Sequence, residues 1–340
     1  MAHGAVQGLR YFREGAPDRP LIALVPGGGH LGRVAYGHPD GDPADFLDHW
    51  LKREGCGLLA LSWPSDHPAV ECRLPDLTLR MWAEWVAEEI AQAAVRQPAA
   101  PILIALWSMA GRGAMAIGAA LATRGVRAAG MVALAAAAPL PGIMPLTPGG
   151  EPLTPEGLWA TAPTPGREPE GKLRYFLDLF AAHEAEIGHT IIPRDIYLSD
   201  YLCNTPIMLR GEAQRSVGGR IAWSAGDALD DLRIAEPVPM PLVGAIIPAS
   251  RADPGHALLD GAMWSAVNAR TIARLAGRPE GEGWTRAVAL AHEAPARLRC
   301  FTPYGHFFLL GAEGARSTVA DMLALHKAIG ALEAEFAALN

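Results

Sequence analysis

Short apolar runs bounded by turn residues recur along the chain. Four continuous runs lie at 21–25, 57–63, 101–107 and 130–138, and the strand pattern resumes later at 240–247 and 296–301. Continuous apolar runs of this length are typical of strands that are buried on both faces, as in a parallel sheet. The pattern therefore predicts a mostly parallel sheet built from two stretches of the chain.

Helical periodicity fills the intervals between these runs. In the segment 78–96, "TLRMWAEWVAEEIAQAAVR", the apolar side chains from Leu79 to Ala93 fall on one stripe, and the segment stops before Pro98. The Ala- and Gly-rich segment 109–124 is typical of a helix packed closely on a sheet. Further helices are expected at 257–276 and 314–337. Strands that alternate with helices predict an α/β fold with helices on both faces of the sheet.

The segment 139–238 interrupts this alternation. Nine prolines fall between Pro139 and Pro169, a density that no strand or helix tolerates. Two aromatic-rich pieces that look helical follow, at 172–188 and 195–213. We therefore expect one core, formed by residues 1–138 and 239–340, with a lid or cap insertion at 139–238.

Composition and charge narrow the class of function. The 340 residues carry a formal net charge of −7 and show no Lys/Arg cluster, which argues against nucleic-acid binding. The longest apolar stretch is broken by proline and is too short to cross a bilayer, and the N-terminus does not resemble a secretory signal. The four cysteines lack the spacing of a zinc site. We expect a cytoplasmic protein that acts on a small molecule, without nucleic-acid or membrane partners; a monomer and a homodimer are both compatible with the sequence.

A serine lies at a predicted strand-to-helix turn, in "ALWSMAGRGAMAIG". A tight turn there would project the Ser108 hydroxyl above the sheet, at the positive end of a helix. Ala110 and Gly111 are small, as such a turn requires, whereas Leu106 is large. The turn resembles the nucleophile elbow of the α/β-hydrolase superfamily, G-x-S-x-G, with Leu106 in place of the first glycine. A serine that only caps a buried helix is the alternative.

The resemblance implies a triad in the chain order serine, acid, histidine. The histidine follows the last strand in this superfamily, and "FTPYGHFFLLG" places His306 there. The acid is expected after an earlier strand, where "PASRADPGHALLD" offers Asp253, with Asp260 as an alternate. A structural loop histidine and a helix-capping aspartate remain the alternatives. The segment "HEAEIGH" at 183–189 lacks the second histidine of the zinc motif H-E-x-x-H, and we expect no metal site.

The glycine-rich segment "LIALVPGGGHLGRV", residues 21–34, suits two chemistries. Gly27, Gly29 and Gly32 match the dinucleotide fingerprint G-x-G-x-x-G, but the long helix that this site needs would meet glycines and prolines between residues 37 and 43. The segment also resembles the oxyanion loop of the superfamily, with Pro26 where histidine is usual. By that resemblance the N–H groups of Gly28 and Met109 would hold an oxyanion, with Gly29 as a further donor.

Two aromatic side chains beside these groups are candidates for substrate binding. His30 follows the glycines and Trp107 precedes the serine. A purely structural hydrogen bond is an equally good role for His30.

The resemblance implies a sheet of about eight strands and a mechanism without a cofactor. Ser108, His306 and Asp253 would cleave a carboxylic ester, thioester or lactone of a small, moderately apolar substrate through an acyl-enzyme. The fold does not fix the reaction. An acyltransferase with the same triad, a ligand-binding protein without turnover and a nucleotide-dependent oxidoreductase are the alternatives.

Overall fold

A seven-stranded sheet forms the centre of the computed structural model, which describes residues 6–70, 73–140, 150–164, 166 and 168–339. Cys72 and residues 141–149 of the expected lid lie outside this part. In spatial order the strands are β1 (Leu9–Arg13), β3 (Gly57–Ser62), β2 (Leu21–Val25), β4 (Ile102–Trp107), β5 (Ala128–Leu134), β10 (Val243–Pro248) and β11 (Arg299–Thr302). Only β1 pairs antiparallel among these seven. The expectation of a mostly parallel sheet is confirmed, with seven strands instead of about eight.

The buried strands lie where the apolar runs predicted them. β2 matches its run from end to end, whereas β5 ends at Leu134, four residues before the end of its run. Ala135 adopts a φ of +41°, which turns the chain out of the strand. The edge strand β1 was missed because "LRYFR" is only half-buried and has no continuous apolar run.

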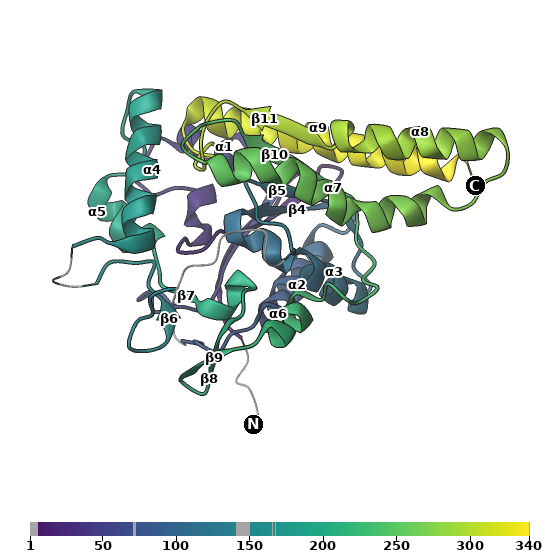
Figure 1. Cartoon of the computed structure of the whole chain (residues 1–340). Coiled ribbons are helices and arrows are strands. Elements are labelled where there is room, and N and C mark those ends of the chain that lie inside the picture. Colours follow the sequence, from purple (N-terminus) through teal and green to yellow (C-terminus); the bar gives the residue numbers. More distant parts are fainter. Residues whose placement is uncertain (1–5, 71–72, 141–149, 165, 167, 340) are drawn as a thin grey trace.

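Helices cover both faces of the sheet, as expected. The helices of the described residues are α1 (Leu47–Arg53), α2 (Leu79–Arg96), α3 (Ala114–Thr123), α4 (Gly171–Ile187), α5 (Arg194–Ile196), α6 (Ala225–Leu232), α7 (Pro254–Ala276), α8 (Glu282–Arg297) and α9 (Ala312–Ala337). Because side chains alternate along a strand, Leu21 and Ala23 of β2 pack in the cluster with α2 and α3, and Ile22 and Leu24 in the cluster with α1 and α9. Helices α7, α8 and α9 extend together to one side (Figure 1).

Residues 139–238 lie between β5 and β10, which pair directly in the sheet, so we call this segment the insertion. Its described part contains α4, α5 and α6 and two small antiparallel pairs: β6 (Leu158–Trp159) with β7 (Thr205–Pro206), and β8 (Gln214–Val217) with β9 (Arg220–Trp223). In Figure 1, α4 and α5 lie at the side of the molecule opposite the far ends of α8 and α9, whereas β6 to β9 lie along the bottom of the view and α6 lies beside α2 and α3.

The expectation of helix across 195–213 is wrong. Only a turn of helix at α5, a π-helical turn at Tyr197–Tyr201 and a 3-10 turn at Ile207–Arg210 form there, with β7 between them. Pro206 cannot donate a backbone hydrogen bond and disfavours helix at the residue before it. Gly211 then ends the last turn in the left-handed region, at a φ of +65°.

No helix among the described residues is both long and apolar enough to cross a membrane.

Candidate active site

Ser108 lies at a strained turn between β4 and the 3-10 helix Ser108–Gly113. Its φ of +56° is unusual for a residue other than glycine. The turn leaves little room: a Cβ at Gly27 would lie 2.5 Å from Ser108 Cβ, and a Cβ at Gly111 would lie 2.5 Å from the Ala137 carbonyl oxygen. Leu106 is fully buried in the cluster with α2 and α3, so its side chain fills the core below the turn. The serine hydroxyl is thereby fixed above the carboxyl end of β4.

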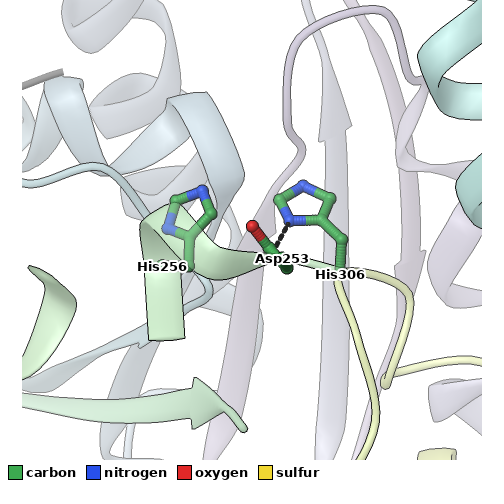
Figure 2. Close-up of side chains that lie close together, drawn as sticks. All are labelled: Asp253, His256 and His306. Carbon is green, nitrogen blue, oxygen red and sulfur yellow. Dashed lines mark hydrogen bonds and ion pairs between the residues drawn. The ribbon is translucent and has the colours of Figure 1, made fainter. Parts of the chain in front are cut away.

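The structure brings Ser108, His306 and Asp253 together from three distant parts of the chain. His306 Nε2 lies 2.9 Å from Ser108 Oγ, and His306 Nδ1 lies 2.7 Å from Asp253 Oδ2. His306 comes from the loop between β11 and α9, and Asp253 is the residue before α7. Figure 2 shows the hydrogen bond between Asp253 and His306. Because a carboxylate only accepts, Nδ1 donates to Asp253 and Nε2 is left to accept the serine hydroxyl proton.

Burial and the interaction between Asp253 and His306 together set the charges of these two residues. Desolvation lowers the pKa of His306 below its usual value, although the hydrogen bond and charge of Asp253 act in the opposite direction. Burial would raise the pKa of Asp253, but the hydrogen bond and charge of His306 outweigh it and lower that pKa. The imidazole is therefore neutral and the carboxylate ionised near pH 7, as a general base and its orienting partner require.

The expected oxyanion donors lie beside the serine. Met109 is the second residue of its helix, so its N–H has no partner within the helix. The Gly28 N–H has no hydrogen-bond partner among the described residues. A Cβ at Gly28 would lie 3.1 Å from Met109 Sδ, which shows how closely the two residues approach. The Gly29 N–H instead donates to Thr205 Oγ1 at 2.8 Å, so this third donor is already engaged.

The insertion holds the glycine-rich loop at several further points. The Leu31 N–H donates to the Tyr201 carbonyl, and the Cys203 N–H donates to the Gly29 carbonyl, both at 2.9 Å. The helix that follows the glycines is a single 3-10 turn, Gly32–Ala35. The long helix that a dinucleotide site requires is therefore not formed at this position.

The structure does not bring His30 and Trp107 to the cavity beside Ser108. His30 is buried, with Nε2 2.7 Å from Tyr197 Oη and Nδ1 3.1 Å from the Gly28 carbonyl oxygen. Burial lowers its pKa to about 3. Trp107 is fully buried, and its Nε1 donates to the His306 carbonyl at 3.2 Å. In this geometry the two rings support the loops that carry Gly28 and His306.

A cavity of about 130 Å³ opens beside the serine hydroxyl. Its lining residues are Gly28, Ser108, Met109, Arg112, Ala137, Trp159, Lys172, Phe176, Arg210, Glu212 and His256. Three of these side chains, Arg112, Lys172 and Arg210, are cationic, and the sequence did not predict them as part of the site. Lys172 and Arg210 belong to the insertion, whose arrangement no periodicity predicts.

A second imidazole–carboxylate pair lies next to the first. His256 Nδ1 is 3.0 Å from Asp260 Oδ1, and the His256 and His306 rings lie 5.2 Å apart (Figure 2). Burial would lower the pKa of His256, but Asp260 outweighs it and raises that pKa. Asp260, the alternate acid, thus contacts His256.

Asp253, His256 and His306 each place one potential metal-ligand atom within 4.8 Å of the others. His306 Nδ1 and Asp253 Oδ2 are already joined by their own hydrogen bond, and His256 Nδ1 is bound to Asp260. These hydrogen bonds engage one ring nitrogen of each histidine and one oxygen of Asp253.

Together the strand order, the antiparallel edge strand, the strained serine after β4 and the inserted segment after β5 are those of the α/β-hydrolase fold. The chain is an α/β-hydrolase-fold protein, as its sequence led us to expect.

Comparisons with known proteins found matches among solved structures alone, all at low sequence identity. No protein-family model and no curated protein sequence matches the chain. Among solved structures, it is similar to a lipase–esterase related protein from Clostridium acetobutylicum, at 14% identity over 94% of this chain and 100% of the other, with a TM-score of 0.42. A carboxylesterase of Nitrososphaera gargenis gives 10% identity, 94% and 95% coverage, and a TM-score of 0.42. A pyrethroid hydrolase gives 15% identity over 89% of this chain and 96% of the other, with a TM-score of 0.43. The fold assignment rests on this chain's own strand order and elbow.

Proposed function

We propose that the protein is a serine hydrolase that cleaves a carboxylic ester, thioester or lactone of a small substrate. The observation that carries this proposal is the continuous hydrogen-bonded chain from Ser108 Oγ through His306 to Asp253, with distances of 2.9 and 2.7 Å. A neutral serine is a poor nucleophile, and a neutral imidazole at this distance is the base that activates it.

The reaction proceeds in two halves. Ser108 Oγ attacks the carbonyl carbon while His306 Nε2 takes its proton, and the resulting oxyanion accepts hydrogen bonds from the N–H groups of Gly28 and Met109. His306 then gives the proton to the leaving oxygen or sulfur, which leaves an acyl-enzyme. Water attacks the acyl carbon, with its proton passing to His306 and then to Ser108 as the acid is released. Asp253 stabilises the imidazolium in both halves.

The cavity sets the size of the substrate. At about 130 Å³ it is smaller than the ~300–1,000 Å³ typical of sites for drug-sized ligands. Trp159 and Phe176 provide apolar wall beside the reacting groups. A short, moderately apolar group fits this space.

Hydrolysis of 4-nitrophenyl acetate tests the proposal. We expect turnover by the wild-type protein that falls at least about a thousandfold in Ser108→Ala and in His306→Ala, and the two losses together should not exceed either one, since the residues act as a unit. Faster release of nitrophenol with an added alcohol, together with formation of the new ester, would identify an acyltransferase instead. Turnover that survives in folded Ser108→Ala would contradict the proposal.

A further inference from the structure

Lys172 lies in the wall of the candidate active site, and no described residue pairs with it as an anion. It is the second residue of α4 and lines the same cavity as Ser108. Its Nζ lies 4.1 Å from the Tyr175 ring centroid and 4.9 Å from that of Phe176. Among the described residues, Lys172 makes no ion pair and no hydrogen bond; Asp253 and Glu151 act on it only at longer range.

The other two cations of the cavity wall are neutralised by carboxylates. Arg112 Nη2 lies 2.8 Å from Glu212 Oε1, and both side chains are buried. Arg210 Nη2 lies 3.1 Å from Glu151 Oε1. Among the described residues of the wall, Lys172 is therefore the lysine or arginine whose charge is not balanced by an ion pair.

Keeping this ammonium in the wall is unfavourable without a counter-ion. Burial lowers the pKa of Lys172 to about 8, although Asp253 and Glu151 raise it. Lys172 is half-buried, and lysine side chains that lose contact with water are normally paired. The sequence contains only three lysines among its 29 basic residues, and the other two, Lys52 and Lys327, are exposed. The chain thus uses arginine for most of its cations and places a lysine in this wall.

We propose that Lys172 binds a free carboxylate of the substrate, so that the protein acts on a small ester or thioester that also carries one carboxylate, such as a monoester of a short dicarboxylic acid. The unpaired charge of Lys172 matches a monoanion. The ammonium is a compact charge with three donors and lies at the apolar wall that Phe176 and Trp159 form, where an aliphatic chain between the carboxylate and the ester would pack. The cleavage of such an ester rests on the proposed function, whereas the binding of a carboxylate by Lys172 does not depend on it.

Two esters of equal acyl-chain length and different charge test this inference. 4-Nitrophenyl hydrogen glutarate and 4-nitrophenyl pentanoate differ at the end of the acyl chain, where the first has a carboxylate and the second a methyl group. We expect the wild-type protein to favour the glutarate ester in kcat/KM. Lys172→Met should lower the ratio of the two kcat/KM values about 10- to 100-fold, which is the range for a lost charge-assisted hydrogen bond. Lys172→Arg should restore part of the ratio, and Lys327→Met, on the exposed face of α9, should leave both activities unchanged.

A ratio that is the same in wild type and Lys172→Met would overturn the inference while leaving ester hydrolysis in place. If neither ester is hydrolysed, the proposed function fails and binding alone decides the inference. Calorimetric titration of Ser108→Ala with monomethyl glutarate should then show binding that is lost in Ser108→Ala/Lys172→Met. Equal binding in the two variants contradicts the inference, and so does inorganic phosphate that binds more tightly than monomethyl glutarate in a Lys172-dependent manner.

Discussion

At the scale of single residues, the site depends on Ser108 and the small residues that surround it. A positive φ at a residue with a Cβ costs about 1–2 kcal/mol, and the turn keeps this conformation because Gly27 and Gly111 allow the neighbouring backbone to approach closely. The sequence predicted this serine from the small residues after it. It could not predict that Leu106 would be accommodated, because that depends on the space between β4 and helices α2 and α3.

The strain at Ser108 predicts a difference between two inactive variants. Ser108→Gly should be more stable than Ser108→Ala by about 1 kcal/mol, since glycine adopts the left-handed region without a Cβ clash. Urea unfolding of both variants measures the difference. Equal stabilities, or a more stable alanine variant, would show that the turn is not strained.

The electrostatics of His306 predict the acid limb of the pH profile. The base works only when neutral, and its pKa is lowered by burial, so kcat/KM for a neutral ester should fall with decreasing pH at an apparent pKa below about 6.5. Among the described residues, the titratable groups that interact with His306 are His30, Asp253, His256 and Lys172.

A substitution at His256 tests whether the acid limb of the kcat/KM profile is due to His306. The charge of His256 contributes to the lowered pKa of His306, so His256→Gln should move the limb to higher pH. A wild-type limb centred above 6.5, or a limb that moves to lower pH in His256→Gln, would contradict this electrostatic account.

At the scale of secondary-structure elements, a buried ion pair joins the turn at Ser108 to the insertion. Arg112, in the 3-10 helix after Ser108, pairs with Glu212 and also donates to the carbonyl groups of Ala138 and Leu140. Because both charged groups are buried, removal of one partner leaves the other uncompensated.

Glu212→Ala should therefore lower the free energy of unfolding by about 3 kcal/mol. The matched control is Asp178→Ala, which breaks the exposed Arg174–Asp178 pair on α4 and should cost less than about 0.5 kcal/mol. Chemical denaturation of the two variants compares them. Similar small losses in both would mean that the Arg112–Glu212 pair does not tie these elements together.

Elements with a continuous apolar run or one apolar stripe were predictable from the sequence, and elements without such a pattern were not. β2 and β4 are buried on both faces, and α2 has one apolar stripe, so their residue patterns carry the signal. α8 was missed although it spans Glu282–Arg297, because it contains Pro295 and only three of its residues are buried. The fold of 195–213 depends on pairing with β6 and on contacts with the glycine-rich loop, which lie far away in the sequence.

At the scale of the whole molecule, the parallel sheet brings distant residues to one edge. Ser108 and His306 are 198 positions apart, and Asp253 and His306 are 53 positions apart. Ser108 follows β4, Asp253 follows β10 and His306 follows β11, so all three lie beyond the carboxyl ends of parallel strands, at the same end of the sheet. The order of strands and the resemblance of the turn allowed all three to be proposed from the sequence. The wall of the cavity could not be proposed, since the insertion positions Trp159, Lys172 and Arg210 through contacts specific to this chain.

The insertion also supports the glycine-rich loop that carries Gly28, one of the proposed oxyanion donors, which predicts a long-range effect on activity. Thr205→Val should leave the buried Gly29 N–H without its acceptor and let the loop shift. We expect kcat for 4-nitrophenyl acetate to fall about tenfold, because loop geometry sets the position of the oxyanion donors. Thr205→Ser keeps the hydroxyl and should retain most of the activity. An unchanged kcat in Thr205→Val would show that this contact with the insertion does not maintain the active geometry of the glycine-rich loop.

Covalent labelling with a fluorophosphonate tests the central claim most directly, because the reagent forms a stable bond only with an activated serine. The account predicts that intact-mass measurement of the wild-type protein shows one adduct, that peptide mapping places it on Ser108, and that folded Ser108→Ala and His306→Ala are not labelled. A folded wild-type protein that is not labelled, or a Ser108→Ala variant labelled as fast as wild type, would contradict it.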